Sequence, residues 1–182
     1  SGVWSEPWIE VDDVVTVDLK KTESIGRGSR NPDTGELGYI ISTGGGIDIL
    51  DWESVLKRYI SKDEVVGILA APPCTDFAVS GARWFAEKDK DGRTDHSLRL
   101  LDATMEIIDW YSPVFWCFEN PVGRIATLRP EIGKPEMYFQ PHEYAGWADD
   151  PEEERYRKKT GLWGNFNTNL PKKDLPPKGV RK

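Results

Sequence analysis

The sequence has few of the residues that would hold a metal ion or a disulfide framework. Its 182 residues include two cysteines, Cys74 and Cys117, and two histidines, His96 and His142. Two cysteines exclude a disulfide-rich secreted scaffold and a zinc site made of cysteines alone. We therefore expect no metal site, and we expect a reducing cytoplasm as the location of the protein.

Long apolar runs and a secretory signal are also missing. No run approaches the roughly 20 residues that span a bilayer, so no membrane partner is expected. With 38% hydrophobic and 30% charged residues, the chain is typical of a globular protein rather than a disordered one. Its length is that of one domain and is sufficient to bury a core.

Positive charge is scarce, with 24 Lys and Arg against 31 Asp and Glu and a net charge of −7. A dedicated binder of duplex nucleic acid is usually basic, because neutralising phosphates supplies much of its affinity. The charge is uneven, since residues 172–182 carry +4, which leaves −11 for the rest of the chain. A second basic cluster over residues 155–159 follows an acidic run over 149–154. Such runs are typical of a solvated face.

Short apolar runs alternate with helical patterns along the chain. The two predicted helices cover residues 51–59 and 97–111, and Ser112-Pro113 ends the second one. The predicted strands cover residues 14–17, 47–50, 65–70, 114–118, 137–139 and 162–163. This alternation predicts an α/β fold with a doubly wound, mostly parallel, Rossmann-like sheet.

Three further segments complete the predicted organisation. Residues 20–42 are rich in Gly, Ser, Asn and Pro and read as a loop or lid. Residues 1–164 are expected to form a single domain, and residues 165–182 a basic, proline-rich tail. No strand precedes Ser1, so we expect the first strand of such a sheet to be missing from this chain.

Polar residues follow several of the predicted strands. In doubly wound sheets the functional site lies at the carboxyl ends of the strands. The residues at these exits are Asp18, Asp48, Cys74 and the pair Glu119-Asn120. We therefore expect the functional site to include some of these residues.

Cys74 stands in the segment Ala71-Pro72-Pro73-Cys74-Thr75-Asp76-Phe77, where two prolines stiffen the backbone. A helix starting after it would favour thiolate over thiol, which is the nucleophilic form. A buried small hydrophobe is the alternative reading, and it is the one expected for Cys117 inside an apolar strand.

Glu119 follows the predicted strand at 114–118. Burial can raise the pKa of such a carboxyl, so that it donates a proton or hydrogen bond to a ring nitrogen. A helix cap or a salt bridge is the alternative role. Together with Cys74, Glu119 indicates a nucleophile-and-acid pair. Arg83, Trp84 and Phe85 are candidates for a lid over this pair or for ordinary packing.

The chain resembles a compact, phage-type cytosine-C5 DNA methyltransferase. Pro72-Pro73-Cys74 resembles the nucleophile motif of that family, and Glu119-Asn120 its Glu-Asn-Val motif, with Pro121 in place of valine. The two motifs stand 45 residues apart. Arg157-x-Lys159 is similar to the arginine-rich motif that follows in the family.

The resemblance implies S-adenosylmethionine as the cofactor and DNA, duplex or single-stranded, as the substrate. It implies that Cys74 is the nucleophile, that Glu119 and Asn120 act on the base, and that Arg157 and Lys159 stabilise charge. Asp18 would hold the ribose, and Asp48-Ile49 would contact the adenine. The residues implied to bind the cofactor are Ser1, Gly2, Trp4, Ser5, Asp18, Leu19, Asp48, Ile49, Ala71, Pro72 and Pro73.

The family also carries a large target-recognition segment after the arginine-rich motif. We expect that segment to be absent or minimal here, so an oligomer or a partner subunit could supply recognition. Two other functions stay open: modification of a free pyrimidine nucleotide at carbon 5, and non-catalytic binding of the cofactor or of a partner.

Overall fold

The structure is a computed structural model that describes residues 14–16, 40–42 and 49–180. The chain divides into two compact units, residues 1–61 and residues 62–182. The grouping of residues 1–164 into one domain therefore stays a prediction.

Among its described residues, the first unit contains a pair of parallel strands and an α-helix preceded by a 3-10 helix. Strand β1 (Val14–Thr16) pairs with β2 (Ile40–Ser42), and α1 covers Trp52–Tyr59. Strand β1 and helix α1 confirm the sequence prediction. The loop predicted over residues 20–42 is wrong at its end, because two isoleucines there join a strand.

The strand predicted at residues 47–50 is also wrong where it is described. Ile49–Asp51 form a 3-10 helix that leads directly into α1. The hydroxyl of Ser54 donates a hydrogen bond to the Asp51 carbonyl at 2.9 Å, which stabilises this helical start. An apolar pair before an acidic residue is thus used as the first turn of a helix.

The second unit contains the larger sheet and most of the helices. Its α-helices are α2 (Phe85–Lys90), α3 (Arg93–Tyr111) and α4 (Ile125–Leu128). Its strands are β3 (Gly67–Ala70), β4 (Phe115–Pro121), β5 (Met137–Phe139), β6 (Tyr156–Arg157), β7 (Thr160–Asn165) and β8 (Gly179–Val180). Short 3-10 helices lie at Lys62–Glu64, Val79–Trp84, Pro130–Ile132, Pro141–Glu143 and Ala145–Trp147.

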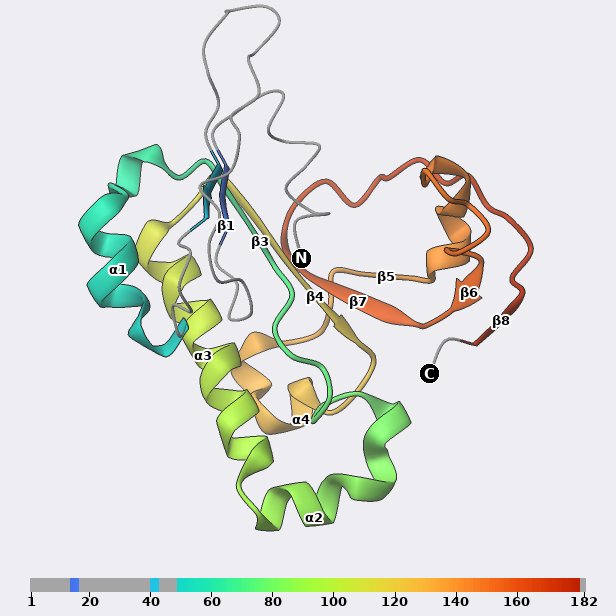
Figure 1. The fold of residues 1–182 in the computed structure, drawn as a ribbon, viewed down its shortest axis with the longest axis horizontal. Coiled ribbons are helices and arrows are strands. Elements are labelled where there is room, and N and C mark those ends of the chain that lie inside the picture. The colour runs from blue at the N-terminus through green and yellow to red at the C-terminus, as the bar shows by residue number, and fades with distance from the viewer. Residues whose placement is uncertain (1–13, 17–39, 43–48, 181–182) are drawn as a thin grey trace, which may run out of the picture. The chain divides into compact units, whose positions relative to one another are not determined.

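The main sheet has the strand order β3-β4-β7-β5 (Figure 1). Strands β3 and β4 are parallel, whereas β7 is antiparallel to both of its neighbours, β4 and β5. It follows that β3, β4 and β5 run in one direction and that β7 alone is reversed. The fold is therefore mixed α/β, as predicted, but two of the three strand pairings are antiparallel.

The core lies between this sheet and α3. Phe118 of β4 stacks on Trp163 of β7 with ring centroids 4.7 Å apart. Phe77, Leu101 and Ile125 close around them and are almost completely buried. Figure 1 shows α3 running alongside β3 and β4. The parallel pair β3–β4 is thus joined by a helical crossover, as parallel strands require.

Helix α3 is longer than the sequence predicts. It begins at Arg93, after Gly92 in a left-handed conformation with φ of 82°, and the side chain of Asp91 accepts a hydrogen bond from the Arg93 backbone N–H at 3.1 Å. It ends at Tyr111, where Ser112 takes a left-handed conformation with φ of 48°. The predicted stop at Ser112-Pro113 is confirmed.

The segment after β7 is irregular up to the short strand β8, which pairs with β6. It is held in place by backbone hydrogen bonds, from Gly146 N–H to the Lys173 carbonyl and from Leu175 N–H to the His142 carbonyl. Across the ranges that the structure describes, no helix has the length and apolar character needed to cross a membrane.

Candidate functional site

Glu119 and Asn120 lie inside β4, where Glu119 pairs with Leu162 and Asn120 with Gly161 of β7. The prediction that they follow the strand is wrong, because pairing with β7 extends β4 to Pro121. Successive side chains of a strand point to opposite faces. Asn120 therefore shares the core face with Phe118, and Glu119 shares the other face with Cys117.

Asn120 connects the two motifs that the sequence singles out. It is completely buried, and its Nδ2 atom donates a hydrogen bond to the carbonyl of Pro72 at 3.0 Å. Pro72 is two residues past the end of β3, so this bond connects the exit of β3 to β4. The Oδ1 atom of Asn120 is buried and has no hydrogen-bond partner in the described structure.

Cys74 sits at the start of a tight turn. Its carbonyl accepts hydrogen bonds from the backbone N–H groups of Phe77 and Ala78 at 3.0 and 2.9 Å. The side chain is partly exposed. The helix start that would have favoured the thiolate does not directly follow Cys74, because a 3-10 helix comes first and α2 begins only at Phe85.

The chain after Cys74 is bound along the chain after Glu119. Val79 donates its backbone N–H to the Val122 carbonyl, and Arg124 donates its own to the Phe77 carbonyl, both at 3.0 Å. Gly123 lies so close to the Phe77 carbonyl that no Cβ atom would fit. The Cys74 turn and the end of β4 thus form one hydrogen-bonded unit.

A buried ion pair stabilises the turn that follows Cys74. The Lys88 ammonium contacts the Asp76 carboxylate at 2.8 Å and donates a hydrogen bond to the Thr75 carbonyl at 2.6 Å. Ser97 donates to the other Asp76 oxygen at 2.5 Å. Burial acts to raise the pKa of Asp76, but the bonds from Lys88 and Ser97 outweigh it and hold this pKa below its usual value.

Arg124 forms a second set of contacts that stabilises this turn. Its Nε donates to the Asp76 carbonyl at 3.0 Å, and its two terminal nitrogens reach Asp89 at 2.8 and 2.7 Å. These bonds lower the pKa of Asp89 to about 2. The guanidinium also lies 3.8 Å from the centroid of the Phe85 ring, so Phe85 serves in packing.

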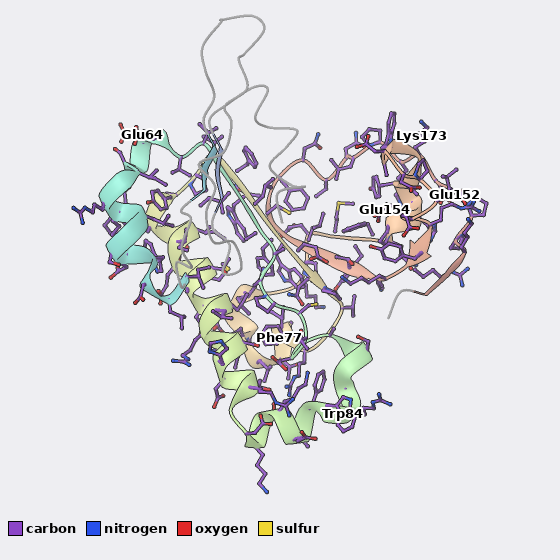
Figure 2. The ribbon with its side chains drawn as sticks, viewed as in Figure 1. Glu64, Phe77, Trp84, Glu152, Glu154 and Lys173 are labelled. Atoms are coloured by element: carbon purple, nitrogen blue, oxygen red, sulfur yellow. The ribbon has the colours of Figure 1, made fainter. Side chains whose placement is uncertain are left out.

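Trp84 is different, because it is half-exposed and has the Arg83 guanidinium 5.0 Å from its ring. Figure 2 shows Phe77 in the interior and Trp84 at the periphery beside α2. A role of Arg83 and Trp84 in a lid stays a prediction.

Glu119 is largely shielded from solvent. Its side chain is 19% exposed, and the Lys158 ammonium is 3.9 Å from its Oε1 atom. Burial raises the pKa of Glu119, and the charge of Lys158 offsets part of that effect. The direction agrees with the sequence prediction of a carboxyl that retains its proton more readily than usual.

Cys117, on the same face of β4, is buried. Burial and then the charge of Glu119 raise the pKa of its thiol to about 11. These findings confirm the interpretation of Cys117 as a small buried hydrophobe, because a thiol with that pKa is inert at neutral pH.

Neither of the two cations expected at the site forms an ion pair with Glu119 in the described structure. Among the ion pairs of the described residues, Lys158 is the cation that reaches Glu119, rather than Arg157 or Lys159. Lys159 instead has its ammonium 4.7 Å from the centroid of the Tyr138 ring. Lys158 was missed because three basic residues in a row carry no signal of which one faces the site.

Most of the residues expected to bind the cofactor lie outside the described residues: Ser1, Gly2, Trp4, Ser5, Asp18, Leu19 and Asp48. Ile49 is in the 3-10 helix of the first unit. Ala71 and Pro73 are exposed after β3, and Pro72 between them is buried. Within residues 49–180, no cluster of three or more His, Cys, Asp or Glu side chains could hold a metal ion.

The second unit therefore combines a partly exposed thiol with a carboxyl of raised pKa and an adjacent ammonium. Such a set can attack an electron-poor ring carbon while a proton is supplied to the ring. No protein-family model and no curated protein matches this chain.

Proposed function

We propose that this protein is a cytosine-C5 DNA methyltransferase that uses S-adenosylmethionine and forms a covalent bond through Cys74. The observation that carries the proposal is the hydrogen bond from buried Asn120 to the Pro72 carbonyl. It joins the loop that bears the nucleophile candidate to the strand that bears the acid candidate. These two groups are the ones that this reaction needs.

The reaction begins with the Cys74 thiolate, which adds to carbon 6 of cytosine and forms an S–C bond. The displaced ring electrons are accommodated when Glu119 gives a proton or hydrogen bond to nitrogen 3, and carbon 5 becomes nucleophilic. Carbon 5 would then take the methyl group that bound S-adenosylmethionine would supply, with the cofactor leaving as the neutral thioether. Carbon 5 would lose its proton to a base, and nitrogen 3 would return its proton to Glu119. Elimination breaks the S–C bond and returns Cys74 to its thiolate.

Lys158 is suited to adjust the protonation of Glu119 during these reaction steps. Its ammonium lies 3.9 Å from the Glu119 carboxyl, so it limits how far burial raises the pKa of Glu119. The raised pKa favours the protonated form of the carboxyl, which is the form that can donate to the ring.

The described residues after β3 fit part of a cofactor site. Ala71 and Pro73 offer an exposed apolar rim. An adenosine carries an apolar ring face that suits such a rim. When bound there, S-adenosylmethionine would supply the methyl group.

The sheet supports the finer assignment of a doubly wound, Rossmann-like domain. Strands β3, β4 and β5 run in one direction, and a single reversed strand is compatible with such folds. The exit of β3, where Cys74 follows, is then the place where ligands bind in open α/β sheets.

Substitution of the two cysteines tests the proposal. We expect Cys74→Ala to abolish transfer of labelled methyl groups to cytosine-containing oligonucleotides, because it removes the nucleophile. Cys117→Ala is the matched control, and we expect it to retain activity, since that thiol is buried and protonated. Undiminished methyl transfer by Cys74→Ala would contradict the proposal.

A free pyrimidine nucleotide is the second candidate substrate, and the net charge of −7 favours it over a long polyanion. The same assay with cytidine monophosphates distinguishes the two, since transfer to the nucleotide but to no oligonucleotide would identify the smaller substrate.

A further inference from the structure

The basic end of the chain is bound to acidic residues of the same unit. Its residues 171–180 form a strap that runs back along the segment between β5 and β7, and Figure 1 shows its last strand, β8, beside β6. Lys172 contacts Glu143 at 2.6 Å, and Lys178 contacts Glu152. Two of the positive charges that the sequence concentrates here are therefore paired within the protein.

The first half of the strap is attached to the 3-10 helices between β5 and β6. The Lys173 N–H donates a hydrogen bond to the Glu143 carbonyl at 3.1 Å, and the Lys173 carbonyl accepts one from the Gly146 N–H at 2.9 Å. The Trp147 indole donates to the Pro171 carbonyl at 2.9 Å. Backbone hydrogen bonds therefore hold this half of the strap in addition to the ion pairs.

The strap approaches Gly146 so closely that a larger residue does not fit there. A Cβ atom at Gly146 would lie 2.8 Å from the Lys173 carbonyl oxygen and 2.7 Å from its Cδ atom. An alanine would therefore push the strap away. Gly179, at the other end of the strap, has no atom within 4 Å of the same position, so an alanine fits there.

The second half of the strap is attached to the segment that leads into the candidate site. Arg155 donates from Nε to the Pro176 carbonyl at 2.8 Å, and its own carbonyl accepts a hydrogen bond from the Lys178 N–H at 2.6 Å. Among the strands that the structure describes, β8 is the one that pairs with β6. The strap thus fixes the backbone immediately before Lys158.

Lys158 is the residue that follows β6, and its ammonium lies 3.9 Å from the Glu119 carboxyl. Its carbonyl accepts a hydrogen bond from the Thr160 hydroxyl at 2.9 Å, where β7 begins. The backbone of Lys158 is therefore held by the strap through β6 on one side and by the main sheet on the other. Without the strap, one of these two attachments is lost.

We propose that the strap, residues 171–180, positions the Lys158 ammonium at Glu119. The strap residues are positioning residues, because they act through β6. The assignment rests on the proposed function only for the role that Glu119 has in the reaction. Among the described residues, the charged or titratable groups placed against Glu119 are the Lys158 ammonium and the Cys117 thiol. Of these two, the strap holds the first.

Titration of Glu119 tests the proposal in the full-length protein without any substrate. Its carboxyl is followed by ¹³C NMR, and its signal is identified by its absence from Glu119→Gln. Lys158→Met should raise the pKa of Glu119, because the ammonium opposes the effect of burial. Gly146→Ala should produce most of the same rise, and Gly179→Ala, the matched control, should produce none.

A double substitution distinguishes positioning from a general loss of stability. In the Lys158→Met background, Gly146→Ala should cause no further rise, because its effect depends on that side chain. If Gly146→Ala fails to fold, Glu152→Gln replaces it, since it removes the ion pair with Lys178. Loss of a negative charge would by itself lower the pKa of Glu119, so a rise in this variant would come from movement of Lys158.

Four results would overturn the assignment. A folded Gly146→Ala protein could titrate like the unaltered one, or its rise could persist in the Lys158→Met background. Gly179→Ala could cause an equal rise, or Glu152→Gln could cause none where Gly146→Ala does not fold. Failure of the proposed function is seen separately, since Cys74→Ala should show the normal titration of the carboxyl whether or not the protein transfers methyl groups.

Discussion

At the scale of single residues, the environment of Glu119 decides what the site can do. The carboxyl points away from the core, next to Cys117 on β4, and is only 19% exposed. Burial therefore favours its protonated form, while Lys158 limits that preference. A protonated carboxyl next to a cytosine ring can donate to nitrogen 3, which makes carbon 6 of that ring electrophilic.

The raised pKa of Glu119 predicts a pH-dependent difference between the protein and its Glu119→Gln variant. A carboxyl whose folded-state pKa is raised from 4.5 adds stability at low pH and loses it as the pH rises through the folded value. Glutamine has no such dependence. We expect the free energy of unfolding of Glu119→Gln to rise relative to the unaltered protein as the pH increases.

Urea denaturation of both proteins at several values from about pH 4 to about pH 8 measures this difference. Carboxyls with lowered pKa, such as Asp76 and Glu143, are common to both proteins and cancel in the comparison. A stability difference that is constant over this range would mean that the pKa of Glu119 is not raised.

At this scale the sequence predicted part of the site. Cys74 and Glu119 could be selected because polar or reactive residues beside apolar runs stand out. The partner of Glu119 could not be selected from the sequence. Neighbouring side chains point in different directions, and the sequence does not say which of Arg157, Lys158 and Lys159 points toward Glu119. The hydrogen bond from Asn120 to Pro72 could not be predicted either, because the two residues are 48 positions apart in the sequence.

At the scale of elements, the turn that follows Cys74 owes its position to contacts from two helical segments. Lys88 of α2 reaches the Thr75 carbonyl and the Asp76 carboxylate, and Ser97 of α3 reaches the same carboxylate. The Lys88 side chain is only 7% exposed. Removing one member of such a buried pair leaves a charge without compensation.

Lys88→Met is therefore expected to lower the free energy of unfolding by about 3 kcal/mol. The matched control is Lys172→Met, since Lys172 contacts Glu143 at 2.6 Å but is 51% exposed. An exposed pair contributes little, so the control should lose much less stability than Lys88→Met. Chemical denaturation of both variants makes the comparison, and equal losses would mean that the Asp76–Lys88 pair does not stabilise the turn.

The elements themselves were predicted unevenly. Helix α3 and strands β1, β3, β4 and β5 follow from apolar spacing, with ends that shift by a few residues. The reversal of β7 could not be predicted, because the apolar pair Leu162-Trp163 carries no sign of strand direction. The need for glycine at position 164 is likewise seen only in the structure, where its φ of 145° and its closeness to the Trp116 carbonyl require a residue without Cβ.

At the scale of the whole molecule, the net negative charge coexists with a local cluster of positive charge. The chain carries −7 overall, yet Arg157, Lys158 and Lys159 stand together just before β7, and the Lys158 ammonium lies 3.9 Å from Glu119. A substrate that is anionic but short, or a single strand held at one sheet end, is compatible with that distribution.

The most direct test of the central claim is a mass spectrum of the protein after incubation with S-adenosylmethionine and an oligonucleotide that contains 5-fluorocytosine. Fluorine cannot leave carbon 5 as a proton does, so the bond between Cys74 and carbon 6 should persist. We predict a covalent adduct of protein and oligonucleotide that is lost in Cys74→Ala and retained in Cys117→Ala. No adduct on single-stranded or duplex DNA, from protein shown to bind S-adenosylmethionine, would contradict the account.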